Sequence, residues 1–483
     1  MVRPDPSADV RRPRPGPAPT LLQLAAMVRA STVAGTLPAV LLGSLALLST
    51  PGRAEPARVE LPELVRRAQA SERARMAVAD RDAARARAGE ADAARWARIT
   101  ATGFVAPSPS ITCVDPDCTA TDPSDFALRF SGVFAGAQVQ VTQPLYTFGK
   151  LSAVREAARL GLEAQAALAD ATAGDLALDA ARAYWGLKLA RELRWMLEDG
   201  DEQISRAIER LDERLASGDA EVTIQDRQRV EVLVAEARVQ LAEARQGEAT
   251  ALAAVRALGG DPGLDIDEAP LEAVAFDLDA DEARAVEIAR AGRPEVRAAR
   301  QGALAARRLA DLEAAGYLPD LALVGSLGYA RAQGVDDAPS AFSYDPYNGA
   351  TGALAVVMRW QLEPWTTSAR VARARAGERR AQALADLAVT GATLDARAAR
   401  AEATGARQKL DAATAGEQAA RAWLAAVLQA DAIGAAEARD LADAYIAWFQ
   451  MRARLVGAIF QWNVAVMRVR RAAGEFTHDA QRR

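Results

Sequence analysis

Two very long stretches without proline constrain the fold of this chain more than any other feature of its 483 residues. No proline occurs from Leu145 to Asp261, and none occurs from Trp365 to the end of the sequence. An α-helix rises about 1.5 Å per residue, so even half of either stretch predicts a rod on the order of 90 Å long. A compact globular domain cannot contain such a rod. Abundant alanine and an aromatic content of only 5% indicate thin, closely packed helical seams.

A short alternating segment precedes each of these stretches. In residues 137–142 (AQVQVT) and 354–362 (LAVVMRWQL), apolar side chains recur at every second position. A period of two predicts a β-strand with one apolar face. We expect Pro144 and Pro364 to end these strands, because proline has no N–H group to donate to a ladder. Helical spacing begins almost immediately afterwards, so each strand passes directly into a long helix.

The rest of the chain follows the same order twice. The first half predicts a helix over 57–97, strands over 99–106 and 126–143 around a loop, a helix to Ala216, and a second helix ending at Gly259 before a linker over 261–280. The second half predicts a helix over 281–316, strands over 318–329 and 353–362, a helix to about residue 430, and a last helix to Gly474. A shift of about 217 residues superposes Val139 on Val356. This pattern predicts two helix–strand–strand–helix–helix repeats over residues 55–280 and 281–475, with a tail over 476–483.

The second helix of the first repeat carries a regular apolar stripe. Its members recur at spacings of three, four and seven, as in a coiled coil: Val230, Val234, Ala237, Leu241, Ala244, Ala251, Val255 and Leu258. We therefore predict that this helix packs along its whole length against another helix.

Residues 1–54 have the pattern of a secretory signal peptide. An apolar segment over 37–48 is followed by the small-x-Ala sequence Gly52–Ala54, and Met27 is an alternative start. The apolar segment is shorter than the roughly 20 residues that a membrane span requires. No cysteine follows the cleavage site, so lipid attachment at that point is chemically excluded. We predict an exported protein.

Cys113 and Cys118 are the only cysteines of the chain. In an exported protein, a disulfide between them is the interpretation we favour, with two free thiols or a metal site as alternatives. A metal site is the weakest of these, because His478 is the only histidine. No nucleophile elbow or phosphate loop occurs either, so we predict no catalytic residue, no cofactor and no metal. The net charge of −5 argues against a nucleic-acid partner.

Four amphipathic strands cannot close a barrel within one chain. Lipid tolerates only helices and closed barrels, because every backbone polar group must be paired. Three copies would supply twelve strands, which is within the range of outer-membrane barrels. Their apolar faces would contact outer-membrane lipid, and the long helices would continue the barrel as a helical cylinder. We expect these aromatic residues at the membrane interfaces: Phe130, Phe134, Tyr146, Trp360 and Trp365.

These residues resemble the TolC family of outer-membrane efflux and secretion channels. Gln143–Leu187 is similar to the strand-to-helix passage of the family's first repeat, and Ala432–Gly474 is similar to its second. The resemblance implies a mostly α-helical homotrimer with a twelve-stranded β-barrel in the outer membrane and a long α-helical barrel in the periplasm. It also implies a passive exit duct of a tripartite efflux pump or type I secretion system. The alternative is an exported periplasmic coiled-coil scaffold, or interaction protein, without a conducting pore.

The resemblance further implies a gate at the periplasmic end. In the family, acidic residues shortly after the second-repeat glycine form rings, and here Asp440 and Asp443 follow Gly434. The first repeat departs from this pattern, because Ile224 occupies the acidic position and Asp226 follows two residues later. Converging carboxylates would repel one another and attract cations. The alternative is that these acids simply cover a solvated helix face.

The two helix turns are the predicted docking surface for a periplasmic adaptor, which joins the channel to an inner-membrane pump. The residues assigned to it are small or mixed in character: Leu215, Ser217, Gly218 and Asp219 in the first repeat, and Ile433, Gly434, Ala435 and Arg439 in the second. The alternative is that the glycines serve only to end the helices.

Overall fold

The computed structural model describes residues 57–110, 130–217, 223–278, 282–335, 337, 345, 347–433 and 438–476. The chain divides into two units, Met1–Glu55 and Pro56–Arg483, and the described residues all belong to the second unit. Several predictions therefore fall outside the described residues: the signal peptide, the pairing of Cys113 with Cys118, the tail beyond residue 476, and the turn residues Gly218, Asp219, Gly434 and Ala435. These remain predictions.

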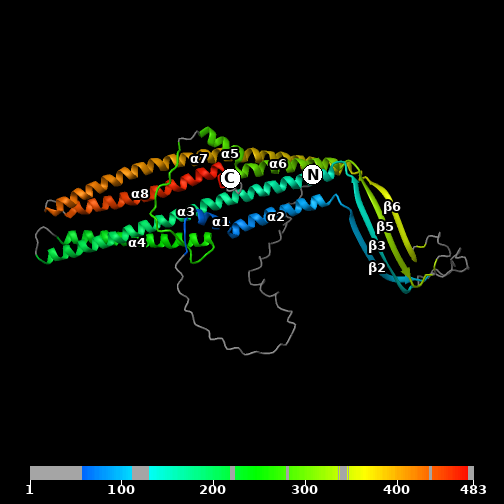
Figure 1. The fold of residues 1–483 in the computed structure, drawn as a ribbon, viewed down its shortest axis with the longest axis horizontal. Helices are drawn as coiled ribbons and strands as arrows, with labels where there is room; N and C mark the ends of the chain where they lie inside the picture. Colours follow the sequence, from blue (N-terminus) through cyan, green and yellow to red (C-terminus); the bar gives the residue numbers. More distant parts are fainter. Residues whose placement is uncertain are drawn as a thin grey trace, which may run out of the picture. The chain divides into compact units, whose positions relative to one another are not determined.

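The four predicted strands form a single antiparallel sheet. Its order is β2 (Arg98–Pro109), β3 (Phe130–Tyr146), β5 (Asp320–Ala332) and β6 (Gly349–Arg359), as Figure 1 shows. The prediction that Pro144 ends its strand is wrong. Pro144 pairs with Ala322 inside the sheet, and the register shifts between Pro144 and Tyr146. A local irregularity lets the ladder accommodate a residue that lacks an N–H group.

The four predicted long helices are confirmed. Helices α3 (Lys150–Ala216) and α7 (Pro364–Ala432) contain 67 and 69 residues, which corresponds to about 100 Å each. Helices α4 (Ile224–Gly259) and α8 (Ala438–Ala473) contain 36 residues each. The near-equal lengths match the predicted internal repetition. All eight members of the apolar stripe on α4 are buried or half-buried, as expected for a coiled-coil seam.

Two predicted helices are interrupted, and each break has a local cause. The helix expected over 57–97 is divided into α1 (Leu61–Ala68) and α2 (Glu72–Ala93), with Ser71 in extended backbone before α2. The helix expected over 281–316 is divided into α5 (Glu282–Gly292) and α6 (Pro294–Ala315). Arg293 is extended there, because the proline that follows it disfavours helical backbone at the preceding position.

The predicted linker over 261–280 contains a strand. Its residues Asp265–Ile266 (β4) pair in parallel with Arg58–Val59 (β1), so that the linker and the first described residues form a two-stranded sheet. Ile266 and Leu264 are fully buried in a cluster with Leu64 and Val255. The linker is therefore anchored on the helices rather than spanning solvent.

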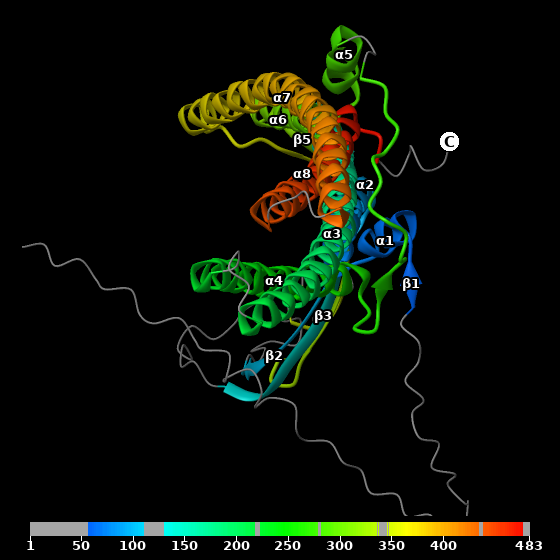
Figure 2. The same cartoon turned by 90° about the vertical axis from the view of Figure 1, so that its left-hand side faces the viewer.

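The helices pack side by side in an order that matches the sheet. Helices α2, α3, α6 and α7 contact one another in sequence, in the same order as β2, β3, β5 and β6. Further from the sheet, α4 packs on α3, and α8 packs on both α7 and α3. Figure 2 shows these helices as one curved layer within residues 57–476. Among the described helices, none is both long enough and apolar enough to cross a membrane.

Candidate functional site

One face of the sheet is apolar and uncovered. The register places Ile99, Val141 and Leu354 in one row across the strands, and Val139 pairs with Leu327 in the neighbouring row. Leu354 is 75% exposed, and Leu327 is 72% exposed. No described part of the chain covers these side chains. An apolar face of this extent requires a partner or lipid.

The opposite face of the sheet carries polar and small residues together with one aromatic cluster. Thr100, Gln140 and Ser326 share this face, since Gln140 pairs with both of the others. Phe134 also lies on it, and its ring contacts Phe104 with 4.8 Å between centroids. Phe134 therefore does not lie on the apolar face of the sheet, and its place at a membrane interface stays a prediction. The alternation of β3 turns its side chain the other way.

Short junctions connect the sheet to the long helices. Gly149 precedes α3 with φ of 89°, a left-handed conformation that glycine adopts without strain. The Lys150 ammonium donates to Asp320 Oδ1 at 2.9 Å and to the Leu318 carbonyl at 2.8 Å. In the second repeat, the Trp360 indole N–H donates to the Tyr317 carbonyl at 3.1 Å. These contacts tie the starts of both long helices to the base of β5.

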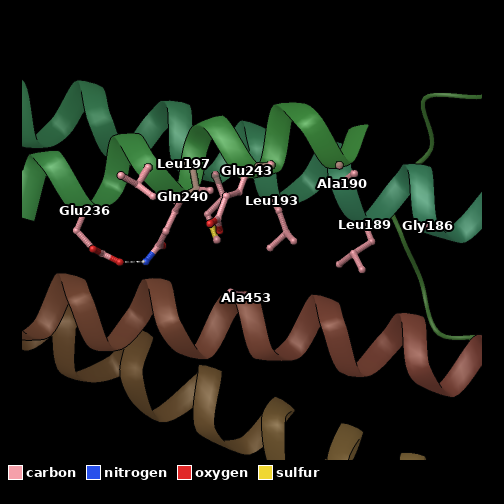
Figure 3. A pocket seen from close by; sticks show the side chains of 13 residues that line it. Gly186, Leu189, Ala190, Leu193, Leu197, Glu236, Gln240, Glu243 and Ala453 are labelled. Atoms are coloured by element: carbon pink, nitrogen blue, oxygen red, sulfur yellow. Dashed lines mark hydrogen bonds between the residues drawn. The ribbon is translucent and has the colours of Figure 1, made fainter. Parts of the chain in front are cut away.

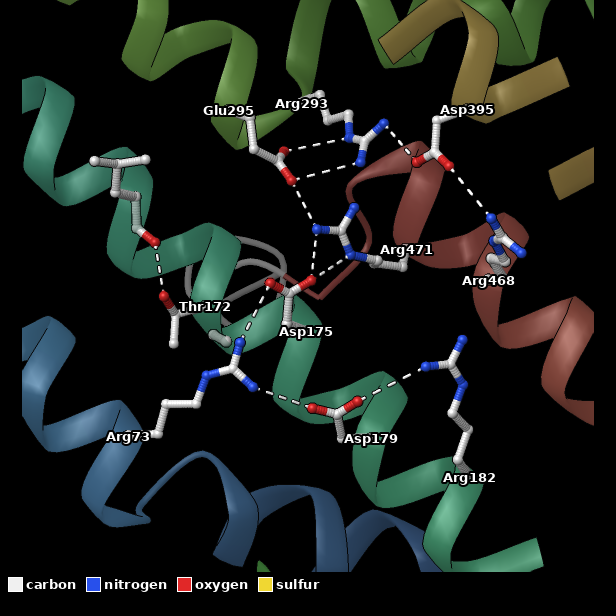
Figure 4. Close-up of polar contacts among 12 residues, drawn as sticks. Arg73, Thr172, Asp175, Asp179, Arg182, Arg293, Glu295, Asp395, Arg468 and Arg471 are labelled. Carbon is white, nitrogen blue, oxygen red and sulfur yellow. Dashed lines mark hydrogen bonds and ion pairs between the residues drawn. The ribbon is translucent and has the colours of Figure 1, made fainter. Parts of the chain in front are cut away.

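Five charged residues link the two repeats midway along the helices. This inter-repeat ion network consists of Asp175, Arg293, Glu295, Asp395 and Arg471, and Figure 4 shows it. Arg471 of α8 donates to Asp175 of α3 and to Glu295 of α6, both at 2.7 Å. Arg293 pairs with Glu295 and, at 2.8 Å, with Asp395 of α7. The network thus joins α3, α6, α7 and α8 at one level.

Residues 261–278 form a strap across the helices, further from the sheet than the ion network. The Lys188 ammonium of α3, only 7% exposed, donates to Asp267 and to the Ala269 carbonyl at 2.6 Å each. Further along the strap, the fully buried Asn463 of α8 receives the Val274 N–H at 2.8 Å. The strap therefore fastens α3 of the first repeat to α8 of the second.

The far ends of the pairs α3–α4 and α7–α8, from which the two turns start, lie at the end of the helices opposite the sheet (Figure 1). Asp440 and Asp443 are exposed in the first two turns of α8, and Arg439 lies 3.8 Å from Asp443. The structure thus brings a predicted docking residue, Arg439, next to a predicted gate residue. Asp226 is the third residue of α4, as Asp440 is the third residue of α8.

The remaining turn residues differ in exposure. Leu215 is half-buried near the end of α3, and Ser217 is exposed just after it. Ile433 is 80% exposed at the end of α7. Arg227 of α4 donates to Asp212 of α3 at 2.7 Å, and this hydrogen bond raises the pKa of the Arg227 guanidinium. The first turn is thus held by a charge pair between its two helices.

A groove of about 660 Å³ runs between the two helix pairs (Figure 3). Its floor is apolar and comes from α3, with Leu189, Leu193 and Leu197. Glu236 and Glu243 of α4 line its edge, and α8 contributes Ala453. The sequence did not predict this groove, because the groove depends on how α3, α4 and α8 pack together in the tertiary structure.

Comparisons with known proteins agree with this geometry. Residues 285–475 match the sequence model of the family described as outer membrane efflux protein. A comparison with curated proteins found no match. The CmeC outer membrane channel of Campylobacter jejuni has the same fold, with a TM-score of 0.72 and 15% identity over 92% of this chain and 94% of that chain.

Two further solved structures share the fold. The outer membrane protein VceC of Vibrio cholerae superposes with a TM-score of 0.70 and 19% identity, over 86% of this chain and 96% of that chain. The open-state MtrE outer membrane channel of Neisseria gonorrhoeae superposes with a TM-score of 0.67 and 18% identity, over 93% of this chain and 100% of that chain. The family match covers residues 285–475, and the solved outer membrane channels share the fold of this chain.

Sequence reasoning missed the ion network and the strap. Many of their contacts join segments far apart in the sequence, such as Asp175 and Arg471, which are 296 positions apart. The available signal was Pro294, which breaks a helix beside two charged residues. A second signal was the set of glycines in α3 that lie against α8, namely Gly174, Gly186 and Gly200.

Proposed function

We propose that three copies of this chain form the exit duct of a tripartite efflux pump or type I secretion system. The observation that carries the proposal is a four-stranded sheet with an uncovered apolar face and two open edges, β2 and β6. In lipid, each open edge must be paired. Three copies would pair β6 of each with β2 of the next and give twelve strands. The duct would carry out no reaction of its own.

The uncovered apolar face also separates this function from the alternative of a periplasmic scaffold. A coiled-coil scaffold requires the long helices and their seams, but it has no use for apolar side chains that are 60 to 75% exposed on a sheet, such as Met358 and Leu354. In water such a face would promote aggregation. The membrane-spanning function accounts for both parts of the molecule.

The first prediction tests this function with the unaltered protein. We expect it in the outer-membrane fraction, as a trimer that dissociates only when heated before electrophoresis. Purified trimer should conduct ions in planar bilayers. A soluble monomer that does not bind lipid vesicles would refute the proposal and favour the alternative of a periplasmic scaffold.

The proposed gate is a ring of carboxylates at the periplasmic end. Asp440 and Asp443 lie where three copies would bring their α8 helices toward a common axis. Like charges at close range repel, so cations bound between them would hold the opening narrow. Arg439 pairs with Asp443 within the chain and reduces the charge of the ring. Asp226, at the equivalent position of α4, is the candidate for a ring from the first repeat.

The second prediction tests this gate. Replacing Asp440 and Asp443 together by alanine should raise single-channel conductance and weaken block by divalent cations, because the converging charges are gone. Asp411→Ala is the matched control, since Asp411 is an exposed acid on α7 with an arginine partner four residues away. Unchanged conductance and unchanged block by divalent cations in the double variant would show that Asp440 and Asp443 do not form the gate.

The proposed partner at the turns is a periplasmic adaptor that joins the duct to an inner-membrane pump. Ile433 offers an exposed apolar contact, and Ser217 and Arg439 offer exposed polar ones. The groove beside α3 extends away from these turns and provides an apolar floor that a helix of the adaptor would cover. Gly218, Asp219, Gly434 and Ala435 belong to the same proposed surface.

A further inference from the structure

Charged side chains are rare in the four-stranded sheet, and three of the four lie at its base, the end nearest the helices. Arg98 begins β2, Asp320 begins β5, and Arg359 ends β6. The fourth, Arg331, lies near the opposite end of β5 and pairs with Asp337. The base of the sheet therefore holds most of the charge that its strands carry.

Both arginines at the base lie on the polar face of the sheet, opposite the apolar one. One row of paired residues crosses all four strands on this face: Thr100, Gln140, Ser326 and Ala353. Arg98 is two positions from its row member in β2, and Arg359 is six positions from its row member in β6. Successive side chains of a strand alternate between the faces, so an even separation keeps a residue on the same face.

Neither arginine side chain has an ion pair or a hydrogen bond with the part of the chain that the structure describes. Both side chains are exposed. Asp320 is the register partner of Arg359 in β5, but its Oδ1 accepts a hydrogen bond from Lys150 Nζ at 2.9 Å. Three positive charges and one negative charge thus leave two positive charges in excess on each copy.

The start of α7 adds to this positive charge. From Arg359 to Arg380 the sequence holds six arginines but only two acids, Glu363 and Glu378. All six arginines are exposed. The chain as a whole has a net charge of −5, so the junction between sheet and helices has the opposite sign to the rest of the molecule. Such a local field attracts anions.

In the proposed trimer, the arginines of the sheet would line the interior of the duct. The apolar face would contact lipid, so the polar face would surround the lumen. Arg98 lies on one edge strand and Arg359 on the other, and β6 of each copy would pair with β2 of the next. Neighbouring copies would therefore supply the two arginines beside each junction, and three copies would supply six. We name these residues, Arg98 and Arg359 of each copy, the luminal arginine band.

The band has depth as well as circumference. The row of paired residues through Arg98 reaches β6 at Ala355, four positions from Arg359. At about 3.3 Å per residue, the two arginines are offset by about 13 Å along the strands. A molecule with several anionic groups could therefore contact more than one arginine as it passes.

The chemistry of arginine specifies what the band would bind. A guanidinium group presents a planar set of donors that matches carboxylate and phosphate groups. Each arginine of the band is exposed, so a bound group would remain partly hydrated and could leave again, as conduction requires. Lipid headgroups also carry phosphate, but they would lie against the other face of the wall.

We propose that the luminal arginine band is a transit site for anionic groups of the cargo, so that the duct exports molecules with several carboxylates or phosphates. The inference rests on the proposed trimeric duct and deepens it, because it identifies a class of cargo. The proposed acidic gate does not cancel the band. It lies at the far end of the helices, many times further away than the screening length of about 10 Å.

Block of the single-channel current tests the band. The purified full-length trimer is inserted in planar bilayers, and tripolyphosphate is added as a linear anion with several charges. We expect it to block the current. Replacing Arg98→Gln and Arg359→Gln together should raise the half-blocking concentration at least about tenfold, because charge-assisted hydrogen bonds are lost. The reversal potential in a KCl gradient should shift toward cation selectivity.

Two controls separate the band from other effects. Arg331→Gln removes an exposed arginine of the same sheet whose register partner, Ala135, lies on the apolar face, and it should leave block by tripolyphosphate unchanged. Spermine, a linear polycation, is the matched probe. Its block should not weaken in the double variant, because the band does not attract cations.

The remaining outcomes overturn the inference. If tripolyphosphate does not block the unaltered trimer, the band binds no anion, and this result does not depend on the folding of any variant. Equal block in the unaltered protein and the double variant places the anion elsewhere. An equal loss of block by spermine shows that the substitutions distorted the pore. If the unaltered protein is monomeric or does not conduct, the proposed function itself fails, and this is measured first.

Discussion

Glu295 shows how a half-buried charge is kept ionised within the helical layer. Burial alone raises the pKa of this carboxyl. Its backbone hydrogen bond and the charges of Arg293 and Arg471 outweigh burial, so that the pKa lies below the usual value. Asp267 of the strap follows the same logic, because hydrogen bonds from Lys188 and Tyr184 outweigh its desolvation. Both carboxylates stabilise the fold only while they are charged.

The third prediction follows from the direction of the Glu295 shift. An acid with a lowered folded-state pKa stabilises the protein above its unfolded pKa of about 4.5, and this contribution disappears as the pH falls through the folded value. Glu295→Gln should therefore lower the free energy of unfolding by about 1 to 3 kcal/mol at pH 7. The deficit should shrink below pH 4. Thermal unfolding followed by circular dichroism measures both.

The control for this prediction is Glu287→Gln, on the neighbouring helix α5. Glu287 is 73% exposed and lies 3.9 Å from its arginine partner, so its loss should change stability little. An equal loss in both variants, or a Glu295→Gln deficit that does not depend on pH, would contradict the role of the ion network.

At the scale of the elements, the contact between α3 and α8 depends on three glycines of α3. Gly174, Gly186 and Gly200 face Arg471, Phe460 and Phe449 of α8, respectively. Because these glycines have no side chains, α3 and α8 approach each other closely. This contact joins the long helix of the first repeat to the last helix of the second. At Gly200 the approach is tightest, since an added Cβ would lie 3.1 Å from the ring of Phe449.

The fourth prediction concerns this contact. Gly200→Leu should destabilise the protein by about 1 to 3 kcal/mol, because the leucine must displace Phe449. Gly161→Leu is the control on the same helix, where an added Cβ meets nothing within 4 Å, and helix propensity should make it neutral or stabilising. Chemical unfolding of the purified trimer compares them. Equal changes in the free energy of unfolding in the two variants would show that α3 and α8 can move apart at Gly200 without loss of stability.

At the scale of the whole molecule, sheet and helices form one continuous wall. Strands and helices follow the same lateral order, and α3 and α7 each start within a few residues of a strand. The sheet is not complete within one copy, since both of its edges are open. A rotational arrangement of copies would pair both edges. This requirement is the strongest support for a duct.

The fifth prediction distinguishes the two faces of the sheet. Leu327→Arg places a charge on the apolar face and should cost about 2 to 4 kcal/mol per copy if that residue lies near the middle of the membrane. Ser326→Arg places the same charge one residue away, on the polar face, and should be tolerated. The measurement is the yield of heat-dissociable trimer in the outer-membrane fraction. Equal yields would mean that the apolar face does not contact lipid.

Much of this architecture was predictable from the sequence, because its signals are local. Alternation over 137–142 and 354–362 specified strands, and the proline-free stretches specified the long helices with nearly correct ends. The same local reading failed where neighbours in space decide the outcome. Pro144 continues its strand because β5 pairs with it there.

By itself, the sequence determined the types of element, their lengths and their repetition, since hydrophobic period and proline placement act within a few residues. Only the tertiary structure decided which charges meet, how the strap crosses α3 and α8, and which helix faces stay uncovered. Those features join residues far apart in the chain, such as Asp175 with Arg471 and Lys188 with Asp267. Long-range pairing depends on register between elements, and no local pattern contains that register.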